Sequence, residues 1–314
     1  MSGVLVVTEV VDGRLDESVR ELVTAAVAVG GPVTLGVAAA DVDAVLADTA
    51  IAGVDEVVTV RLAAGGFDHE LQRHAVRAMI EQVTPDVVVL GYTIRAAAYA
   101  AALAEELGLG FASDVVGLSR DAGELVAIKP VYGGKVYAEL GFASDAAVLV
   151  TLRPGVWEQA EVAGAPAAVR EVALGGSAVS RVRHVEYLAP AGGVDLKRAD
   201  VIFSVGRGVG AKENIEKFAE IANKLGAGLG ASRPLVDSGW LPAAHQVGQT
   251  GVSVKPKLYV AFGISGALQH LAGMSGSKKI IAINTDKDAP IFNVADVGAV
   301  ADILEVADEL KALI

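Results

Sequence analysis

The stretch Leu258-Tyr-Val-Ala-Phe-Gly-Ile-Ser-Gly-Ala-Leu-Gln-His270 decides the fold expected for the second half of the chain. Its first five residues are aliphatic or aromatic, which is typical of a buried strand. Gly263 ends this run, and we expect the chain to re-enter as a helix near Ser265. Such a junction presents unpaired backbone N–H groups and the positive end of a helix dipole, which attract anions. The stretch therefore predicts a phosphate-binding turn at the carboxyl end of a strand.

Other polar loops follow predicted strands in the same half of the chain. Arg207 follows Val201–Val205, Ser232 and Arg233 follow Ala227–Ala231, and Asn284 follows Lys279–Ile283. The carboxyl ends of parallel strands share one edge of a sheet, where open α/β sheets bind ligands. A single glycine loop is more often a plain tight turn, so the prediction of a nucleotide site rests on the convergence of these loops. Apolar spacing also predicts a helix from Ile215 to Leu225 and a terminal helix over Val297–Leu313.

The first half of the chain alternates strand and helix patterns. Strands are predicted at Val4–Thr8, Val33–Val37, Glu56–Val60 and Asp86–Leu90, and helices at Asp16–Val29, Asp41–Ala50, Asp68–Gln82 and Arg95–Leu107. This alternation indicates right-handed crossovers and a mostly parallel sheet. Short strands are then expected at Leu125–Lys129, Lys135–Leu140 and Ala146–Thr151, as an antiparallel edge. No constellation of catalytic groups is visible in this half.

The overall expectation is a two-domain α/β protein. Residues 1–188 are predicted to form a mostly parallel α/β domain with an antiparallel edge, which contacts a partner subunit and holds no cofactor. Residues 189–199, rich in glycine and containing Pro190, are predicted to be a linker. Residues 200–314 are predicted to form a doubly wound, Rossmann-like, cofactor-binding domain.

Composition excludes several classes of protein. The chain has 314 residues, a formal net charge of −12 and no cysteine, which argues against a nucleic-acid footprint, a disulfide framework and iron–sulfur ligation. Its mean hydropathy is +0.48, but no apolar run approaches the length of a membrane span. We expect a cytoplasmic protein that does not insert into membranes. His69 and His74 are poorly spaced for a metal pair, and no catalytic triad is visible, so neither a metal site nor a catalytic residue is predicted.

Several motifs, in order along the chain, resemble the alpha subunit of electron transfer flavoproteins. The most specific are Gly248-Gln-Thr-Gly251, Ser265–Met274, Ala282-Ile-Asn284 and Ala289–Asp296, with Gly206-Arg-Gly208 and Gly230–Pro234 upstream. Weaker similarity occurs at Lys129–Gly134 and Leu152–Gly155. The chain departs from the family at Ser204-Val205, where many relatives carry a second glycine.

The resemblance implies that FAD is the cofactor and indicates which residues bind it. These are Arg207, Ser232, Arg233, Val247, Gly248, Gln249, Thr250, Ser265, Gly266, Ala267, Leu268, Gln269, His270, Asn284, Asp302 and Ile303. Ser265–His270 would hold the pyrophosphate, Arg233 would lie over the isoalloxazine, and Thr250 would donate to flavin N5. Asn284, Asp302 and Ile303 match positions that contact the adenosine half. Without the resemblance, Ser265 would be an ordinary helix cap, Arg233 half of a surface salt bridge and Asp302 a first-turn carboxylate.

The resemblance also implies a function. The chain would form a heterodimer with an electron transfer flavoprotein beta subunit and would act as an electron carrier rather than an enzyme. It would take electrons from flavin dehydrogenases, such as the acyl-CoA dehydrogenases of fatty acid beta-oxidation, and pass them to a membrane-associated quinone oxidoreductase. Two alternatives stay open: a subunit of an electron-bifurcating flavoprotein that oxidises NADH, and an NAD-binding module of an oxidoreductase.

Overall fold

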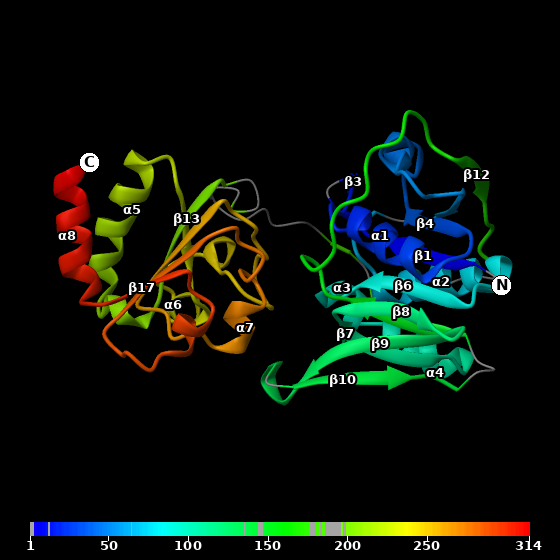
Figure 1. Cartoon of the computed structure of the whole chain (residues 1–314). Helices are drawn as coiled ribbons and strands as arrows, with labels where there is room; N and C mark the ends of the chain where they lie inside the picture. The colour runs from blue at the N-terminus through cyan, green and yellow to red at the C-terminus, as the bar shows by residue number, and fades with distance from the viewer. Residues whose placement is uncertain are drawn as a thin grey trace. The chain divides into compact units, whose positions relative to one another are not determined.

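The computed structural model describes residues 3–11, 13–63, 65–134, 136–143, 147–175, 180–182, 184–185, 196 and 199–314. The chain divides into two compact units, Met1–Tyr187 and Leu188–Ile314 (Figure 1). Of the predicted linker 189–199, only residues 196 and 199 are among those described. Each unit is an α/β structure built on a parallel sheet, which confirms the predicted fold class.

Unit 1 is built on a seven-stranded sheet whose described pairs are all parallel, in the order β12-β5-β4-β1-β6-β11-β7. The strands are β1 (Val4–Thr8), β4 (Val33–Ala39), β5 (Glu56–Arg61), β6 (Val87–Gly91), β7 (Gly110–Val115), β11 (Val148–Leu152) and β12 (Ala168–Glu171). The helices are α1 (Val19–Val29), α2 (His69–Val83), α3 (Ile94–Ala97) and α4 (Ala100–Leu107), with 3-10 turns η1 (Asp43–Thr49) and η2 (Tyr132–Gly134).

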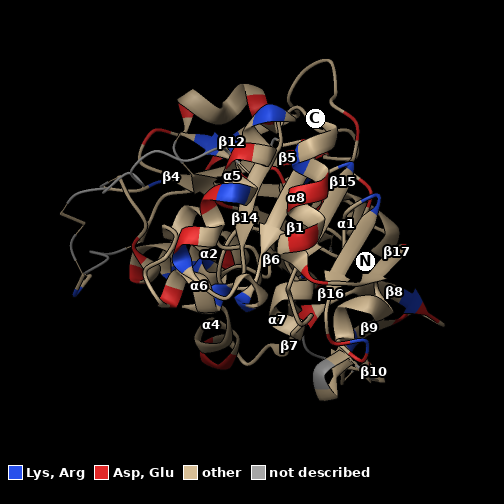
Figure 2. Ribbon diagram, turned by 90° about the vertical axis from the view of Figure 1, so that its left-hand side faces the viewer, with Lys and Arg blue, Asp and Glu red and all other residues tan. Residues whose placement is uncertain are grey.

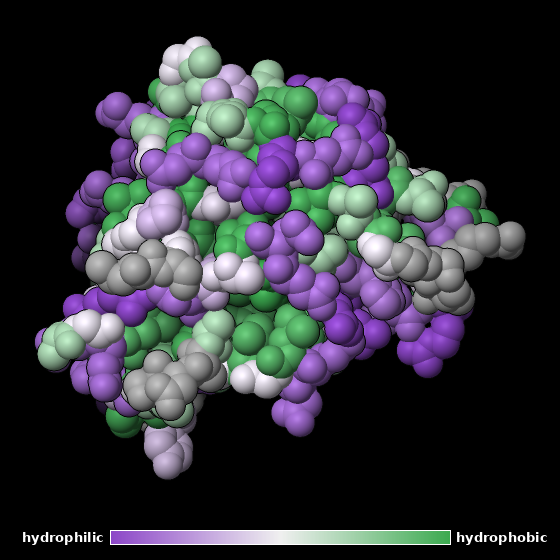
Figure 3. Space-filling view, turned by 90° about the vertical axis from the view of Figure 1, so that its right-hand side faces the viewer, coloured by the Kyte–Doolittle hydropathy of each residue, from purple (hydrophilic) through white to green (hydrophobic). Residues whose placement is uncertain are grey.

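The side chains of the central strand β1 point alternately into the two hydrophobic cores of unit 1, one on each face of the sheet. Val4 and Val6 of β1 pack on the side of α1, whereas Leu5 and Val7 pack on the side of α2 and α4. Successive side chains of a strand point to opposite faces, so a strand that is apolar at every position is buried on both. The ribbons of β1 and β6 accordingly carry no charged residue (Figure 2). On the face drawn in Figure 3, hydrophilic side chains are scattered among hydrophobic ones.

The antiparallel strands of unit 1 form a sheet of their own. This sheet has the order β10-β9-β8, from β8 (Gly117–Asp121), β9 (Glu124–Val131) and β10 (Val136–Gly141), and a two-residue hairpin pairs β2 (Val10–Val11) with β3 (Arg14–Leu15). The expectation that Ala146–Thr151 joins the antiparallel strands was wrong, because β11 lies between β6 and β7 and is parallel to both. Its sequence, Val-Leu-Val-Thr-Leu, is buried throughout, as central parallel strands are.

Unit 2 is built on a five-stranded parallel sheet with the order β14-β13-β15-β16-β17. The strands are β13 (Val201–Val205), β14 (Gly228–Ala231), β15 (Leu258–Phe262), β16 (Ile280–Asn284) and β17 (Val297–Val300). The helices are α5 (Ile215–Lys224), α6 (Arg233–Asp237), α7 (Leu268–Leu271) and α8 (Ile303–Leu313), with 3-10 turns η4 (Arg207–Val209), η5 (Lys212–Asn214), η6 (Ala243–His245) and η7 (Pro290–Asn293).

The two faces of this sheet are covered differently. Helices α5 and α8 lie side by side against one face, where Phe218 packs on Phe262 (Figure 1). The other face is covered mainly by long connections, which contribute Val247, Met274 and Ile291 to a second core. Loops thus replace helices as the main cover of that face.

Two expectations for unit 2 were wrong. Val297–Val300 is a strand rather than the start of the last helix, which begins after Asp302, the residue that caps it by accepting a hydrogen bond from Leu304 N at 2.7 Å. The helix expected near Ser265 begins only at Leu268 and is a single turn. Gly266 has φ +86°, a left-handed conformation that a residue of a right-handed helix does not adopt, so the helix cannot begin before Ala267.

A buried polar pair lies in the loop-covered core of unit 2. The Tyr259 hydroxyl on β15 lies 2.9 Å from His270 Nε2 on α7, and both side chains are buried. His270 Nδ1 has no hydrogen-bond partner among the described residues. Burial lowers the pKa of His270 to about 4, and the backbone of Val247 offsets only part of that effect. His270 is therefore neutral at pH 7.

This burial predicts a loss of stability in acid. Below its ordinary pKa of 6.5, His270 in the unfolded chain takes up a proton that the folded chain refuses until about pH 4, so stability falls as the pH drops between these values. Between pH 7 and pH 4.5 we expect the free energy of unfolding of the wild type to fall by about 2–3 kcal/mol more than that of His270→Gln. Urea unfolding followed by Trp240 fluorescence, in a Trp157→Phe background, measures this for unit 2.

The matched control is His74→Gln, on α2 of unit 1. It should follow the wild-type curve for unit 2. Equal acid losses in the wild type and His270→Gln would contradict the assignment of a depressed pKa to His270.

Candidate functional site

The loops that follow four strands of unit 2 meet at the carboxyl edge of the sheet, as predicted. Gly208 N donates to Gly263 O at 3.1 Å, which ties the loop after β13 to the loop after β15. Ser232 N donates to Val205 O at 3.0 Å, which ties the loop after β14 to the end of β13. These bonds place Arg207, Ser232 and Ser265 on one edge of one sheet.

Glycines allow these loops to approach one another closely. A methyl group at Gly206 would lie 2.4 Å from the Gly263 carbonyl oxygen, and one at Gly273 would lie 2.4 Å from Gly248 N. Both contacts are backbone to backbone, so a side chain at either position would force the loops apart. The glycines of the motifs are thus explained by packing, independently of any ligand.

Residues 265–269 form a run of free backbone donors. The N–H groups of Ser265, Gly266, Ala267, Leu268 and Gln269 make no hydrogen bond to any residue that the structure describes. A hydrogen bond to the turn η7 fixes the start of this segment, because Ile291 N donates to Ser265 O at 3.0 Å. Consecutive N–H groups without acceptors are the backbone arrangement that binds phosphate oxygens. The donor set therefore fits the pyrophosphate of a dinucleotide.

The loop from Val247 to Thr250 lies directly against α7. Gln249 N donates to Gln269 O at 2.7 Å, and Val247 N donates to Ala231 O at 2.9 Å, so the loop extends from the sheet to the helix. Thr250 is exposed, and its Oγ1 accepts a hydrogen bond from Gln246 Nε2 at 2.9 Å. Thr250 therefore keeps its own hydroxyl proton for another acceptor.

The two predicted cations differ in their surroundings. Arg233 begins α6, and its side chain is 64% exposed and paired with Asp237 at 3.2 Å, one helical turn away. This is the surface salt bridge that the isolated sequence suggested, and such pairs contribute little to stability. Arg207 is exposed and has no ion pair within the described part of the chain. Both guanidinium groups are free to reorient toward an anion.

The residues predicted to contact adenosine have structural partners. Asn284 donates from Nδ2 to Ile264 O at 2.9 Å and accepts from Asp286 N at 3.0 Å. Asp302 caps α8, and Ile303 is buried in the core. Ala301 N donates to Asn284 O at 3.2 Å, so Asn284 and Asp302 lie near each other at the same edge. At Ile303, only the backbone is available to a ligand.

Sequence reasoning missed two polar residues beneath the site. Tyr259 was predicted only as part of a strand, and Ser204 only as a departure from a glycine. Both point into the loop-covered core. Ser204 Oγ makes no hydrogen bond of full geometry among the described residues, but its hydroxyl is close enough to that of Tyr259 to lower the pKa of Tyr259. A hydroxyl inside an otherwise apolar strand was the available signal, because such a group requires a partner when buried.

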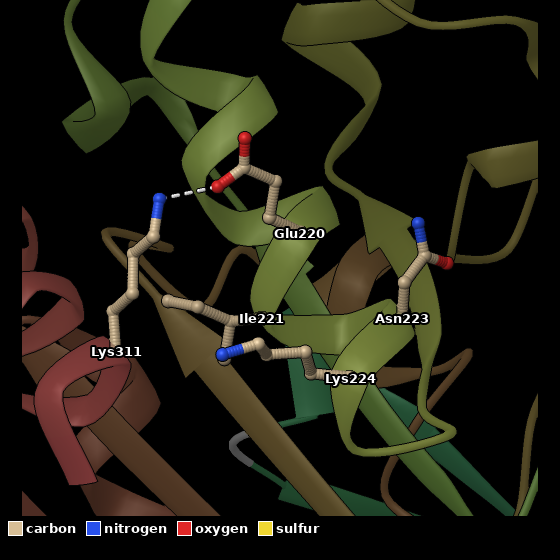
Figure 4. Close-up of a pocket in the computed structure, with 5 residues that line it drawn as sticks. All are labelled: Glu220, Ile221, Asn223, Lys224 and Lys311. Atoms are coloured by element: carbon tan, nitrogen blue, oxygen red, sulfur yellow. Dashed lines mark hydrogen bonds and ion pairs between the residues drawn. The ribbon is translucent and has the colours of Figure 1, made fainter. Parts of the chain in front are cut away.

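An open hollow between α5 and α8 is unrelated to this edge. It is lined by Glu220, Ile221, Asn223, Lys224 and Lys311 (Figure 4). Lys311 forms an ion pair with Glu220 across it. Both helices run away from the carboxyl edge, and the hollow lies near their C-terminal ends. It therefore has neither the polar loops nor the free N–H groups of the site.

The sheet of unit 1 has its own switch point, between β1 and β6, and a carboxylate occupies it. Glu9 follows β1, and its Oε1 accepts a hydrogen bond from Thr93 Oγ1, which follows β6. Burial raises the pKa of Glu9, while the bond from Thr93 and the charge of Arg95 act in the opposite direction. A carboxyl group of the same chain thus lies at the point where open α/β sheets bind ligands.

No cluster of three or more His, Cys, Asp or Glu side chains suited to a metal ion occurs within the described residues. Among the helices described, none combines the length and the apolar character needed to cross a bilayer.

Comparison with known proteins identifies the family. Residues 4–176 match the electron transfer flavoprotein domain, and residues 195–275 match the electron transfer flavoprotein FAD-binding domain. The electron transfer flavoprotein subunit alpha of Methylophilus methylotrophus is 41% identical over 283 residues, which span 89% of this chain and 88% of that protein. The subunit alpha of Syntrophomonas wolfei subsp. wolfei is 39% identical over 99% of this chain and 98% of its own length. Protein FixB of Clostridium saccharobutylicum is 40% identical over 73% of this chain and 70% of its own.

The match to the FAD-binding domain identifies FAD as the cofactor. The chain belongs to the electron transfer flavoprotein family, among its alpha subunits.

Proposed function

We propose that the chain is the alpha subunit of a heterodimeric electron transfer flavoprotein and holds FAD along the carboxyl edge of the unit 2 sheet. The observation that carries this proposal is the run of five backbone N–H groups, residues 265–269, that have no acceptor in the described part of the chain and lie beside the other polar loops of that edge. FAD supplies the redox chemistry, and the protein supplies position and electrostatics. Residues 200–314 would form the FAD-binding domain.

The remaining site residues receive roles from their positions. Ser232 and Arg207 would add donors to the phosphates, and Arg233 would release Asp237 to lie over the isoalloxazine. Thr250 would donate the hydroxyl proton that its bond from Gln246 leaves free. Val247, Gly248 and Gln249 would supply backbone contacts in the same loop, and Asn284, Asp302 and Ile303 would line the adenosine end.

Residues 1–188 would serve as a subunit-contacting domain without a cofactor. The contact between Glu9 and Thr93 supports the absence of a cofactor from this domain, because a carboxylate disfavours a phosphate at the switch point.

Exposed aromatic and aliphatic residues support the contact with another subunit. Ile128 and Tyr137 lie on one face of the β9–β10 pair, and Tyr132 in the turn between them is 83% exposed. Tyrosines are enriched at protein interfaces.

The chain would carry electrons in the cytoplasm and perform no chemistry on a substrate. It would accept electrons from flavin dehydrogenases such as acyl-CoA dehydrogenases, and deliver them to a membrane-associated quinone oxidoreductase. The membership of the family supports the carrier role, and an acidic chain is suited to transient partners that present basic surfaces. Oxidation of reduced complex by each candidate partner, followed by flavin absorbance, tests this route.

The first prediction from this proposal concerns retention of FAD. The edge of unit 2 offers backbone donors along one side of a dinucleotide only, so we expect the full chain alone to lose FAD on gel filtration. The complex with its beta subunit should retain about one FAD per heterodimer, measured by flavin absorbance. Stoichiometric FAD on the purified, monomeric chain would contradict the prediction.

The second prediction concerns Arg233. A charged hydrogen bond or contact to the ring would favour the added electron by roughly 1.5–3 kcal/mol, and about 1.4 kcal/mol corresponds to about 59 mV for one electron. Arg233→Ala should therefore lower the potential for the first electron by roughly 60–130 mV, while FAD stays bound through residues 265–269. Potentiometric titration of the complex measures the shift.

Asp237→Asn is the matched control, since it breaks the same ion pair but keeps the cation. This variant should not lower the potential. A wild-type potential in Arg233→Ala with FAD fully bound would mean that Arg233 does not face the ring.

A further inference from the structure

Tyr259 is an unusual residue for the centre of a parallel sheet. It lies in the middle of the run Leu-Tyr-Val-Ala-Phe of β15, and its side chain is completely buried. Burying a hydroxyl without a partner costs free energy, and its partner here is His270 Nε2 at 2.9 Å. Burial also raises the pKa of Tyr259, so its hydroxyl keeps its proton. Tyr259 is therefore a permanent hydroxyl group held against one nitrogen of His270.

That contact decides where the proton of His270 lies. The ring is neutral at pH 7, so it carries one N–H and one lone pair. If Tyr259 donates to Nε2, the ring proton must be on Nδ1; if Nε2 carries the proton, the Tyr259 hydroxyl needs another acceptor. Among the described residues, Ser204 also acts on the Tyr259 hydroxyl and lowers its pKa, as a donor to the phenol oxygen does and an acceptor does not. Tyr259 therefore keeps its own proton for Nε2, and the first arrangement satisfies both buried groups.

The surroundings of Nδ1 favour the same arrangement. The backbone of Val247 favours the protonated form of the His270 ring, which a carbonyl acceptor does and an N–H donor does not. Because Nε2 is occupied by Tyr259, the nitrogen on which Val247 acts is Nδ1. Nδ1 makes no hydrogen bond of full geometry among the described residues, so a ligand beside the Val247–Thr250 loop would compete for its N–H with the Val247 carbonyl alone.

We propose that Tyr259 is a positioning residue that holds His270 in the tautomer with its proton on Nδ1, so that His270 presents a donor, and not a lone pair, to the flavin. The inference rests on the proposed function for the identity of that ligand, but the tautomer itself is a property of the chain. The distinction matters for electron transfer. An N–H group stabilises negative charge that develops on the ring system, whereas a lone pair on the same nitrogen would oppose it.

The direct test is nitrogen NMR of the full chain carrying isotope-labelled histidine, alone and in the complex with its beta subunit and FAD. The His270 signal is assigned by its absence from His270→Gln. In the wild type at pH 7 we expect the proton on Nδ1, and in Tyr259→Phe we expect it to move to Nε2 in a large fraction of molecules. A proton on Nε2 in the wild type, or an unchanged tautomer in Tyr259→Phe, would overturn the proposal.

A second variant separates this role from a merely structural one. Tyr99→Phe removes a buried tyrosine hydroxyl in unit 1 and leaves the bond between Tyr259 and His270. It should not change the tautomer. A shift as large as in Tyr259→Phe would also overturn the proposal, because it would trace the effect to general loosening of the fold.

The flavin potential of the complex links the tautomer to function. Tyr259→Phe and His270→Gln should both lower the potential for the first electron, and the double variant should add little to His270→Gln, because the two residues act in series. Additive shifts in the double variant would overturn the positioning role. A change of tautomer with no change in potential would keep the role of Tyr259 and instead overturn the placement of FAD beside His270, which distinguishes the two failures.

Discussion

The site depends on one constraint: the loops at the carboxyl edge of unit 2 are packed backbone against backbone. At Gly206 and Gly273 no side chain fits between neighbouring loops, so the main chain itself forms the floor of the site. In these loops the N–H groups of residues 265–269 have no acceptor among the described residues. The cost is a loop-covered face of the sheet with little regular helix, where buried polar groups such as Tyr259 and His270 must satisfy each other.

Most of the fold was predictable because short apolar runs indicate its strands. The structure has strands at the predicted positions Val4–Thr8 and Val201–Val205, and Asn284 ends its strand as expected. The convergence of the polar loops was also predictable, since parallel strands must end at a common edge. The glycine motifs indicated where loops come close, although the sequence alone could not distinguish packing from ligand contact.

What the sequence did not predict depends on contacts between distant residues. The strand at Val148–Leu152 was recognised, but its partners were not, because pairing is decided by the whole sheet. The late start of α7 follows from the left-handed conformation of Gly266, which glycine permits without requiring it. The hydrogen bond between Tyr259 and His270 joins a strand to a helix. The spacing of residues within one element cannot predict such a contact. Burial of this pair also keeps the His270 ring neutral at pH 7, because it lowers the pKa of His270 to about 4.

Glu9 places a carboxyl group at the switch point of the unit 1 sheet, and this distinguishes the sheet from that of unit 2. Because the carboxylate is covalently part of the chain, its effective concentration at the switch point cannot be diluted, and a nucleotide from the surrounding solution would have to displace it at equilibrium. The related architectures of the two units thus differ in the charge that the chain itself places at the carboxyl edge. One anion, built into the chain, makes that edge of unit 1 a less favourable place for an anionic ligand than the edge of unit 2 with its unpaired N–H groups.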